Sequence, residues 1–320
     1  MKVLVIGGAG YIGSVLSSKL LQAGFKVVVL DNLLFGGESI ISMLGKTNFQ
    51  FIKGDVCSSE EVKNSLKNVQ AVINLAALVG EHACKPQPKL AWQVNYKGAV
   101  DLAKLAKRAG IKRFIFVSTC SNYGISDVRS MADENSPVNP ISLYAETKVK
   151  AEKEILVLSE RNFFPYILRL ATVFGLSPRM RFDLLLNELV KDAYVFSKLK
   201  VYQPESWRPV VHVNDVSQAI VSCLKLAHIR KNQQIINIGF GNYQKRQLVS
   251  MIKKYLPKTK IDFVQKRSDN RDYRVSFTKM RQILGFKCHI SPENGIKELF
   301  MALKSGFFFE PQHFRYNNTP

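Results

Sequence analysis

The N-terminal segment VLVIGGAGYIGSVLSSKL restricts the possible folds of this chain more than any other stretch. Gly8, Gly10 and Gly13 have the spacing G-x-G-x-x-G, and Gly7 adds a glycine directly before them. An apolar run precedes the glycines, and an amphipathic helical pattern, Ile12–Ala23, follows them. Glycines at this spacing permit a tight turn, let backbone N–H groups approach a pyrophosphate, and let the helix pack closely on the strand. The segment predicts a strand–turn–helix unit whose helix N-terminus binds a phosphate.

A carboxylate follows the glycine turn at the distance that dinucleotide binding requires. The second apolar run ends in Asp31, about 20 residues after the turn, where such folds place an acidic residue. A carboxylate accepts hydrogen bonds from ribose hydroxyls and repels a 2′-phosphate, so NAD is favoured over NADP. Asp55 and Ala76–Ala77 end the next two strand patterns, at the sheet edge where ligands bind. The predicted cofactor-binding residues are therefore Gly7, Gly10, Tyr11, Ile12, Gly13, Asp31, Asn32, Asp55, Val56, Ala76 and Ala77.

Strand-like and helix-like patterns alternate through the first half of the chain. The apolar runs are Val3–Ile6, Lys26–Leu30, Phe49–Ile52, Ala71–Leu75, Phe114–Val117 and Tyr166–Leu168, and the helical patterns are Ile12–Ala23, Ser59–Leu66, Leu90–Ala109 and Tyr144–Arg161. This alternation is typical of βαβ units that form a parallel sheet with helices on both faces. We predict an α/β protein with a Rossmann-type doubly wound sheet. Residues 1–175 would form the NAD-binding domain and residues 176–320 a smaller substrate-binding lobe, with the chain crossing between the two.

Composition narrows the class of protein further. No apolar run reaches the roughly 18 residues that a membrane span needs, and glycines interrupt the first apolar run where a signal peptide would continue. The five cysteines show no metal-ligand spacing, so we expect reduced thiols, no metal site and a cytoplasmic protein. The formal net charge is +21, yet no nucleic-acid recognition motif accompanies it. A lysine-rich surface and a polyanionic small substrate explain the charge better than nucleic acid does.

The stretch FVSTCSNYG raises the question of which residue at a strand end does chemistry. Ser118, Thr119, Cys120 and Ser121 follow a buried strand pattern, and all four can form hydrogen bonds. Hydroxyl groups at such a position often only satisfy the turn that follows. The stretch alone leaves both interpretations open.

A tyrosine and a lysine further along the chain point to redox chemistry. Tyr144 and Lys148 stand four apart on a predicted helix, hence on one face. An ammonium beside a phenol lowers the pKa of the phenol because it favours the phenolate. A tyrosine tuned in this way can exchange a proton with a sugar hydroxyl while hydride passes to or from a nicotinamide.

With these motifs the chain resembles the extended short-chain dehydrogenases/reductases of the nucleotide-sugar epimerase/dehydratase family. The resemblance runs from Met1 to about Leu303, nearly the whole chain. Its motifs are the glycine turn, Asp31-Asn32, Asp55-Val56, Asn95-Tyr96-Lys97-Gly98, Ser118-Thr119 with Tyr123-Gly124, Tyr144-x-x-x-Lys148, and the stretch RPVVHVND from Arg208 to Asp215. They specify the family far more closely than they specify a substrate.

The resemblance implies a role for each matching residue. The family's catalytic Ser or Thr lies four residues before the tyrosine of the Tyr-Gly pair, which here is Thr119. Thr119 would hydrogen-bond the reacting sugar oxygen, Tyr144 would be the acid/base, and Lys148 would orient the nicotinamide ribose. Asn95 and Ser118 would belong to the cofactor side. Residues on the substrate side would be Thr119, Cys120, Thr172, Asn187, Arg208, Asp269 and Arg271, with Arg208 on the diphosphate. Relatives also pair the helices here predicted at 90–109 and 144–161 across a homodimer.

Two departures from the family pattern bear on the reaction. Cys120 and Ser121 occupy the positions where dehydratases place Asp and Glu, so the acid that an elimination needs is missing. Thr172 stands where relatives have a sugar-side asparagine. In the stretch that resembles the family's diphosphate site, Lys266 is an alternative to Asp269 and Arg271. Cys84 and His212 are best explained as packed structural residues.

The sequence therefore favours an NAD-dependent nucleotide-sugar enzyme that oxidises the sugar transiently at C4, with a 4-epimerase as the leading hypothesis. A 4-keto-sugar reductase and a 4,6-dehydratase remain alternatives. An NAD-sensing binding protein is the alternative from another class, but it would need only the glycine turn and Asp31. The three residues Thr119, Tyr144 and Lys148 argue against it.

Overall fold

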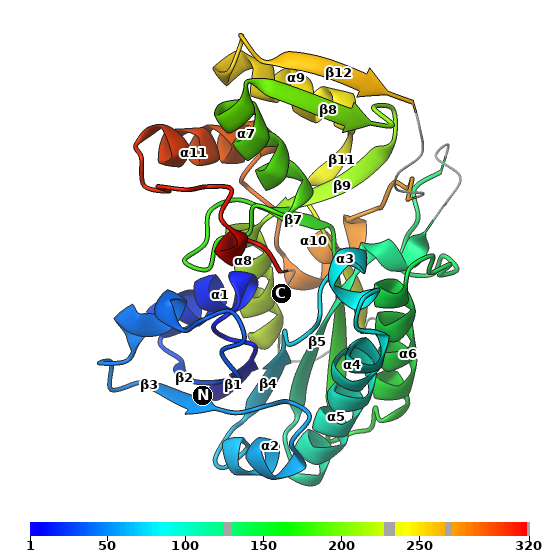
Figure 1. Cartoon of the computed structure of the whole chain (residues 1–320). Helices are drawn as coiled ribbons and strands as arrows, with labels where there is room; N and C mark the ends of the chain where they lie inside the picture. Colours follow the sequence, from blue (N-terminus) through cyan, green and yellow to red (C-terminus); the bar gives the residue numbers. More distant parts are fainter. Residues whose placement is uncertain (125–129, 227–233, 266–270, 319–320) are drawn as a thin grey trace.

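The computed structural model describes residues 1–124, 130–226, 234–265 and 271–318 in two lobes (Figure 1). The larger lobe is built on a seven-stranded sheet with the strand order β10-β6-β5-β4-β1-β2-β3, in which all paired neighbours are parallel. The strands are β1 (Lys2–Ile6), β2 (Lys26–Asp31), β3 (Phe49–Lys53), β4 (Ala71–Asn74), β5 (Arg113–Thr119), β6 (Phe164–Leu170) and β10 (Ile235–Ile238). The predicted doubly wound parallel sheet is confirmed.

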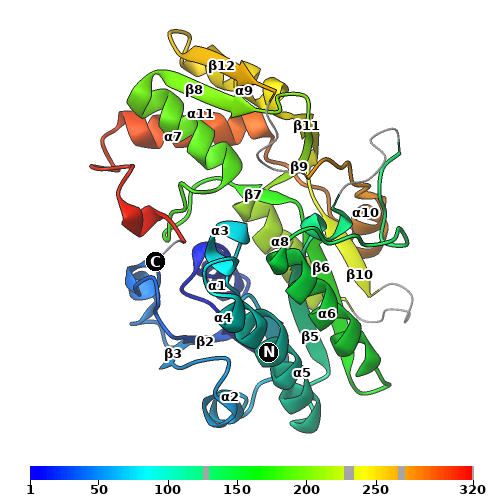
Figure 2. The same cartoon turned by 45° about the vertical axis from the view of Figure 1, so that its right-hand side comes forward.

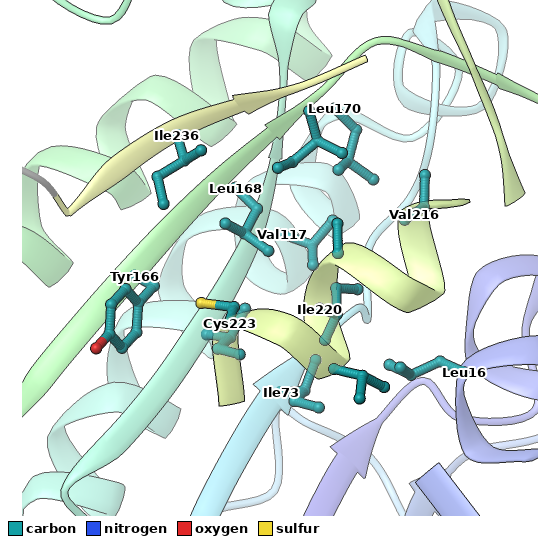
Figure 3. Close-up of a cluster of buried hydrophobic side chains, with 14 of the residues drawn as sticks. Leu16, Ile73, Val117, Tyr166, Leu168, Leu170, Val216, Ile220, Cys223 and Ile236 are labelled. Atoms are coloured by element: carbon teal, nitrogen blue, oxygen red, sulfur yellow. The ribbon is translucent and has the colours of Figure 1, made fainter. Parts of the chain in front are cut away.

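Alternation along the buried strands sends successive side chains to two separate cores. In β1, Val3 and Val5 face one side of the sheet, while Leu4 and Ile6 face the other. The first core is covered by α1 (Tyr11–Gln22) and α8 (Val213–Leu224), and Figure 3 shows Leu16, Val216 and Ile220 packing there. The second core is covered by α2 (Ser59–Ser65), α5 (Ala99–Arg108) and α6 (Leu143–Val157).

The smaller lobe lies above the carboxyl ends of the parallel strands (Figure 2). It holds a three-stranded sheet and a two-stranded one, packed against three helices around a third core. These elements are β7 (Thr172–Phe174), β8 (Lys198–Tyr202), β9 (Trp207–His212), β11 (Gly241–Gln244), β12 (Lys260–Val264), α7 (Leu185–Phe196), α9 (Lys245–Tyr255) and α11 (Pro292–Lys304). Not all of residues 176–320 lie in it: α8, β10 and α10 (Thr278–Leu284) pack on the large lobe.

Two predicted helices differ in detail from those in the structure. The stretch 90–109 is divided into α4 (Pro88–Ala91), a π-helical segment Trp92–Gly98, and α5. π-Helical turns insert an extra residue and often mark functional sites. The helix carrying Tyr144 begins one residue earlier than predicted, where the Ser142 hydroxyl caps it by accepting from the Ala145 N–H at 3.2 Å. It ends at Val157, before a bridge between Glu160 and Phe163 turns the chain into β6.

The remaining described segments are short. Helix α3 (Glu81–Cys84) follows β4, and 3-10 turns occur at Glu38–Met43, Cys120–Tyr123 and Phe314–Tyr316. Across the described ranges, no helix is both long and apolar enough to cross a membrane.

Candidate active site

The glycine turn after β1 is shaped by close backbone contacts. Gly7 has φ +78°, and a Cβ on it would lie 2.9 Å from the backbone nitrogen of Ala76. A Cβ on Gly13 would lie 2.2 Å from the carbonyl oxygen of Gly7. Both positions therefore exclude a side chain, and the turn exposes its backbone at the N-terminus of α1. This geometry fits the pyrophosphate of a dinucleotide.

Asp31 lies at the end of β2, directly against this turn. One carboxylate oxygen accepts from the Ala9 N–H at 2.9 Å, and the other accepts from the Leu33 N–H at 2.9 Å. Burial raises the pKa of Asp31, and the two backbone hydrogen bonds lower it in part. Asn32 is exposed, and its side-chain oxygen accepts from the Leu34 N–H at 3.1 Å. The carboxylate is thus fixed beside the site predicted for the adenosine ribose.

The strands on either side complete the edge of this site. The Asp55 carboxylate accepts from the Cys57 N–H at 2.8 Å, next to the buried Val56. After β4, the Ala76 N–H donates to the Asn74 side chain at 3.1 Å. A cavity of about 160 Å³ opens between the segments that follow β2 and β4. Its lining includes Leu34, Phe35, Ala77, Leu78, Val79 and, from the C-terminal tail, Asn318.

Asn95 in the π-helical segment fixes the loop that lines this cavity. Its side-chain oxygen accepts from the Leu78 N–H at 2.8 Å, and its NH₂ group donates to the Leu78 carbonyl at 2.9 Å. The same NH₂ group lies 3.4 Å from the Thr147 hydroxyl of α6. Asn95 is fully buried, so its position supports a framework role on the cofactor side.

Lys148 of α6 is buried beneath the site, and its side chain packs against β5, the strand that ends in Thr119. Its Nζ lies 4.0 Å from the centre of the Phe116 ring, and only 2% of the residue is exposed. Burial lowers the pKa of Lys148 to about 7, while Glu152 and Cys84 favour the charged form. Close to neutral pH this lysine can therefore gain or lose its proton.

Groups from distant segments of the chain act on the pKa of Tyr144. Burial raises the pKa of the Tyr144 phenol and Cys84 adds to this, whereas Arg181 and Arg271 lower it. We predicted from the sequence that Lys148 would supply the cation. The groups that lower the pKa of Tyr144 in the structure are two arginines that lie far away in the chain, and the effect of Lys148 stays a prediction.

Thr119 ends β5 and caps the 3-10 turn that follows. Its hydroxyl oxygen accepts from the Ser121 N–H at 3.0 Å. A hydroxyl has one proton and two lone pairs, so this bond leaves the proton and a lone pair for a ligand. Thr119 therefore has the groups needed for the role that the family resemblance implies.

The neighbours of Thr119 are directed into the protein. Cys120 is fully buried in the first core and its thiol donates to the Arg169 carbonyl at 3.2 Å. Burial raises the pKa of this thiol well above its usual range. The assignment of Cys120 to the substrate side is therefore corrected. The Ser118 hydroxyl is also buried and donates to Glu152, so it lies below the cofactor site instead of lining it.

Two predicted substrate residues meet below the smaller lobe. Arg208, on β9, donates to its neighbour's carbonyl at 2.8 Å and to the Arg271 carbonyl. The Arg271 guanidinium donates to the Ser121 hydroxyl at 3.4 Å, and that hydroxyl lies 3.4 Å from the Tyr273 hydroxyl. Thr172 is half-buried at the start of β7. Asp269 and its competitor Lys266 lie outside the described residues.

Asn187 joins the two lobes instead of facing a ligand. Its NH₂ group donates to the Tyr11 hydroxyl at 3.2 Å and to the Arg181 carbonyl at 2.9 Å, and its oxygen accepts from the Gly175 N–H at 2.9 Å. The Tyr11 hydroxyl donates in turn to the Gly175 carbonyl at 2.7 Å. Asn187 is fully buried, so its assignment to the substrate side is corrected.

Sequence reasoning missed two arginines in the stretch SPRMRFD. Arg181 binds Asp183 through two nitrogens, at 3.0 and 2.6 Å. Arg179 donates to the Asn317 carbonyl at 2.9 Å and lies 4.6 Å over the Phe35 ring, with its pKa lowered to about 10 by burial and by Arg181. It also lines a second cavity of about 800 Å³ between the lobes. The stretch has no periodicity that would have predicted these contacts.

The parallel sheet, the glycine turn with its carboxylate, and the group Thr119, Tyr144 and Lys148 define an extended short-chain dehydrogenase/reductase. The chain belongs to the NAD dependent epimerase/dehydratase family, whose model matches residues 3–239. The cofactor of this family is NAD, as predicted from Asp31.

Known members of the family match nearly the full chain. A UDP-glucose 4-epimerase of Lactobacillus helveticus is 29% identical over 313 residues, covering 90% of this chain and 92% of that protein. UDP-glucuronic acid 4-epimerase of Bacillus cereus, solved with UDP-glucuronic acid and NAD, is 25% identical with a TM-score of 0.83 and covers 95% and 99%. A dTDP-glucose 4,6-dehydratase of Bacillus anthracis, solved with NAD, is 26% identical with a TM-score of 0.84 and covers 97% and 99%.

Proposed function

We propose that the protein is an NAD-dependent nucleotide-sugar 4-epimerase. The observation that carries the proposal is the position of Tyr144, which is four residues from Lys148 on α6 and close enough to Arg181 and Arg271 for both guanidinium groups to lower its pKa. The proposed cofactor and diphosphate sites would meet at this tyrosine. The similarity over nearly the full chain to proteins named as 4-epimerases supports the same reaction.

The cofactor would be held by the backbone of the glycine turn, by Asp31 and by the Ala76–Ala77 segment, because the absence of side chains on Gly7 and Gly13 lets the turn pack closely and present its N–H groups to a pyrophosphate. NAD bound there would supply a hydride acceptor and donor for the oxidation and re-reduction of sugar C4. Lys148 would orient the nicotinamide ribose.

Tyr144 would take the proton of the C4 hydroxyl and give it back after the sugar has turned. Burial favours the protonated phenol, so the nearby guanidinium groups of Arg181 and Arg271 are needed to make the phenolate accessible. The Thr119 hydroxyl would donate a hydrogen bond to the same sugar oxygen. Arg208 and Arg271 would bind the diphosphate, for which the planar guanidinium is well suited.

The direct test is to incubate the purified protein with a panel of UDP- and dTDP-sugars and NAD⁺, and to identify the products by NMR. We expect a C4 epimer with no net accumulation of NADH. A product that has lost water, or one that forms only when NADH is supplied, would replace this proposal by a dehydratase or a reductase.

The 4,6-dehydratase is the second candidate, favoured by the similarity to the Bacillus anthracis enzyme. Elimination needs an acid for the leaving hydroxyl. Cys120 is buried with a raised pKa and Ser121 is bonded to Arg271, so neither offers an acidic proton where the family's dehydratases place theirs. The 4-keto-sugar reductase shares every proposed residue and differs only in its need for external reductant.

We also propose a homodimer that pairs α5 and α6 with their copies, in the cytoplasm. Val157, at the end of α6, is 83% exposed, and Lys150 lies 4.9 Å over the Tyr96 ring and 5.2 Å over the Trp92 ring on the outer side of these helices. Light scattering at micromolar concentration tests the dimer, and a monomer would count against it. The free thiols of all five cysteines fit a reducing compartment.

A further inference from the structure

Glu152 is a buried carboxylate that collects side-chain hydrogen bonds from two strands and a turn. It accepts from the Ser118 hydroxyl of β5, from the Asn122 NH₂ group at 2.7 Å, and from Arg169 of β6. Arg169 binds it through two nitrogens, with Nη2 at 2.7 Å and Nε at 3.1 Å from the same oxygen. Only 2% of Glu152 is exposed. A carboxylate held in this way has little freedom to move.

Glu152 follows Lys148 by one turn of α6, so the two side chains share a face of the helix. Across from them, Phe116 and Ser118 are alternate residues of β5 and therefore share a face of that strand. The Lys148 ammonium rests on the Phe116 ring, and the Glu152 carboxylate binds the Ser118 hydroxyl. The two contacts together hold α6 against β5 at the point where Lys148 must be positioned.

The charge balance around Lys148 depends on this carboxylate. The groups that act on the ammonium are Glu152 from its own helix, the Cys84 thiol from α3, and the Phe116 ring from β5. The Cys84 thiol is buried and its pKa is raised to about 11, so at neutral pH it carries no charge. Glu152 is then the carboxylate that offsets the cost of burying the ammonium.

We propose that Glu152 is a positioning residue for the reaction: it favours the charged form of Lys148 and helps to fix its ammonium over Phe116, while its bonds to Arg169 and Ser118 hold α6 against the sheet. The proposal rests on the proposed function in so far as Lys148 acts on the bound cofactor. It assigns a role to a buried ion pair that the reaction chemistry itself does not require. On the side away from Glu152, the Arg169 guanidinium donates a further hydrogen bond through Nη1 to the Tyr123 hydroxyl at 3.0 Å.

The test measures the protonation of Lys148 without using activity. In protein labelled with ¹³C at lysine Cε, ordinary lysines titrate near about 10.4, so a resonance that titrates near neutral pH belongs to Lys148, and Lys148→Met confirms the assignment. Removing the negative charge with Glu152→Gln should lower the titration midpoint by about one pKa unit or more, a tenfold loss of proton affinity. Glu146→Gln is the matched control: it makes the same change at an exposed position of α6 and should leave the midpoint in place.

A downward shift smaller than this in Glu152→Gln, or an upward one, overturns the proposal. If Glu152→Gln does not fold because Arg169 is left unpaired, the double variant Glu152→Gln/Arg169→Gln removes both charges of the pair. It should show a smaller downward shift, because losing the Arg169 guanidinium acts on the ammonium in the opposite sense to losing the Glu152 carboxylate. A midpoint unchanged in the double variant would overturn the proposal equally.

The pH profile of turnover separates this inference from the proposed function. In an active enzyme, the limb that reports loss of the Lys148 proton should move to lower pH in Glu152→Gln and stay in place in Glu146→Gln. If no nucleotide sugar is epimerised but the resonance shifts as expected, the proposed function fails and the role of Glu152 in holding the charge stands. If epimerisation occurs but the resonance does not shift, the proposed function stands and the role of Glu152 fails.

Discussion

The Thr119 hydroxyl oxygen accepts a hydrogen bond from the Ser121 backbone N–H at 3.0 Å, so the residue at the head of β5 caps the turn that follows it. The interpretation that a hydroxyl at this strand end satisfies the following turn is therefore correct for Thr119. It does not compete with a role in chemistry, because the capping bond uses a lone pair and leaves the proton free to donate.

The first prediction separates these two functions of Thr119. Thr119→Ser keeps both the cap and the donor, and we expect nearly unchanged stability and a mild loss of turnover. Thr119→Ala removes both, and we expect a loss of about 1 kcal/mol in stability and about tenfold or more in kcat. Urea unfolding and steady-state kinetics measure the two effects. If Thr119→Ala loses stability but keeps its kcat, Thr119 only caps the turn.

The second prediction concerns the choice of cofactor by Asp31. We expect NAD⁺ to bind at least about tenfold more tightly than NADP⁺, a difference of about 1.4 kcal/mol, because the carboxylate repels a 2′-phosphate. Burial raises the pKa of Asp31, so the preference should shrink as the pH falls and the carboxyl group takes up a proton. Calorimetric titration at several pH values measures both effects. Equal affinities at neutral pH would remove Asp31 as the determinant.

The third prediction tests the corrected role of Asn187. Asn187→Ala leaves the Gly175 N–H and the Arg181 carbonyl unpaired in the interior, and we expect the free energy of unfolding to fall by roughly 2–3 kcal/mol. KM for the nucleotide sugar should change by less than about threefold, a difference below 1 kcal/mol. A large rise in KM with unchanged stability would return Asn187 to the substrate site.

The sequence predicted the parts of the site that depend on local spacing. The glycine turn, the carboxylate of Asp31 and the pair Tyr144 and Lys148 each lie within a single βα unit or helix, so a short stretch shows their arrangement. The parallel sheet followed from the same alternation of strand and helix patterns. What could not be predicted depends on contacts between distant segments, such as the pairing of β10 with β6 and the position of Arg181 and Arg271 near Tyr144.

The direction of individual side chains was the second property of the site that the sequence did not predict. The family resemblance placed Cys120 and Ser118 at the site, but the pleat of β5 and the turn after it direct their side chains into the interior. Glu152 could have been noticed, since it stands one helical turn after Lys148 and two turns after Tyr144, on the same face of the helix. A buried carboxylate needs partners, and the sequence does not show that Arg169 and Asn122 supply them.

The last prediction decides whether Cys120 takes part in the reaction. Cys120 packs in the core, its thiol donates to the Arg169 carbonyl, and burial raises its pKa, so it supplies volume and not charge. Cys120→Ala should cost some stability and retain most of the turnover. Tyr144→Phe, which removes the acid/base, should lower kcat by about 10²–10⁴-fold with the fold intact.

Both variants should bind NAD⁺ as the wild type does, which calorimetry checks before kinetics are compared. A Cys120→Ala enzyme that binds NAD⁺ normally yet loses as much turnover as Tyr144→Phe would show that the thiol reaches the substrate, and would favour a reaction that needs a second acid.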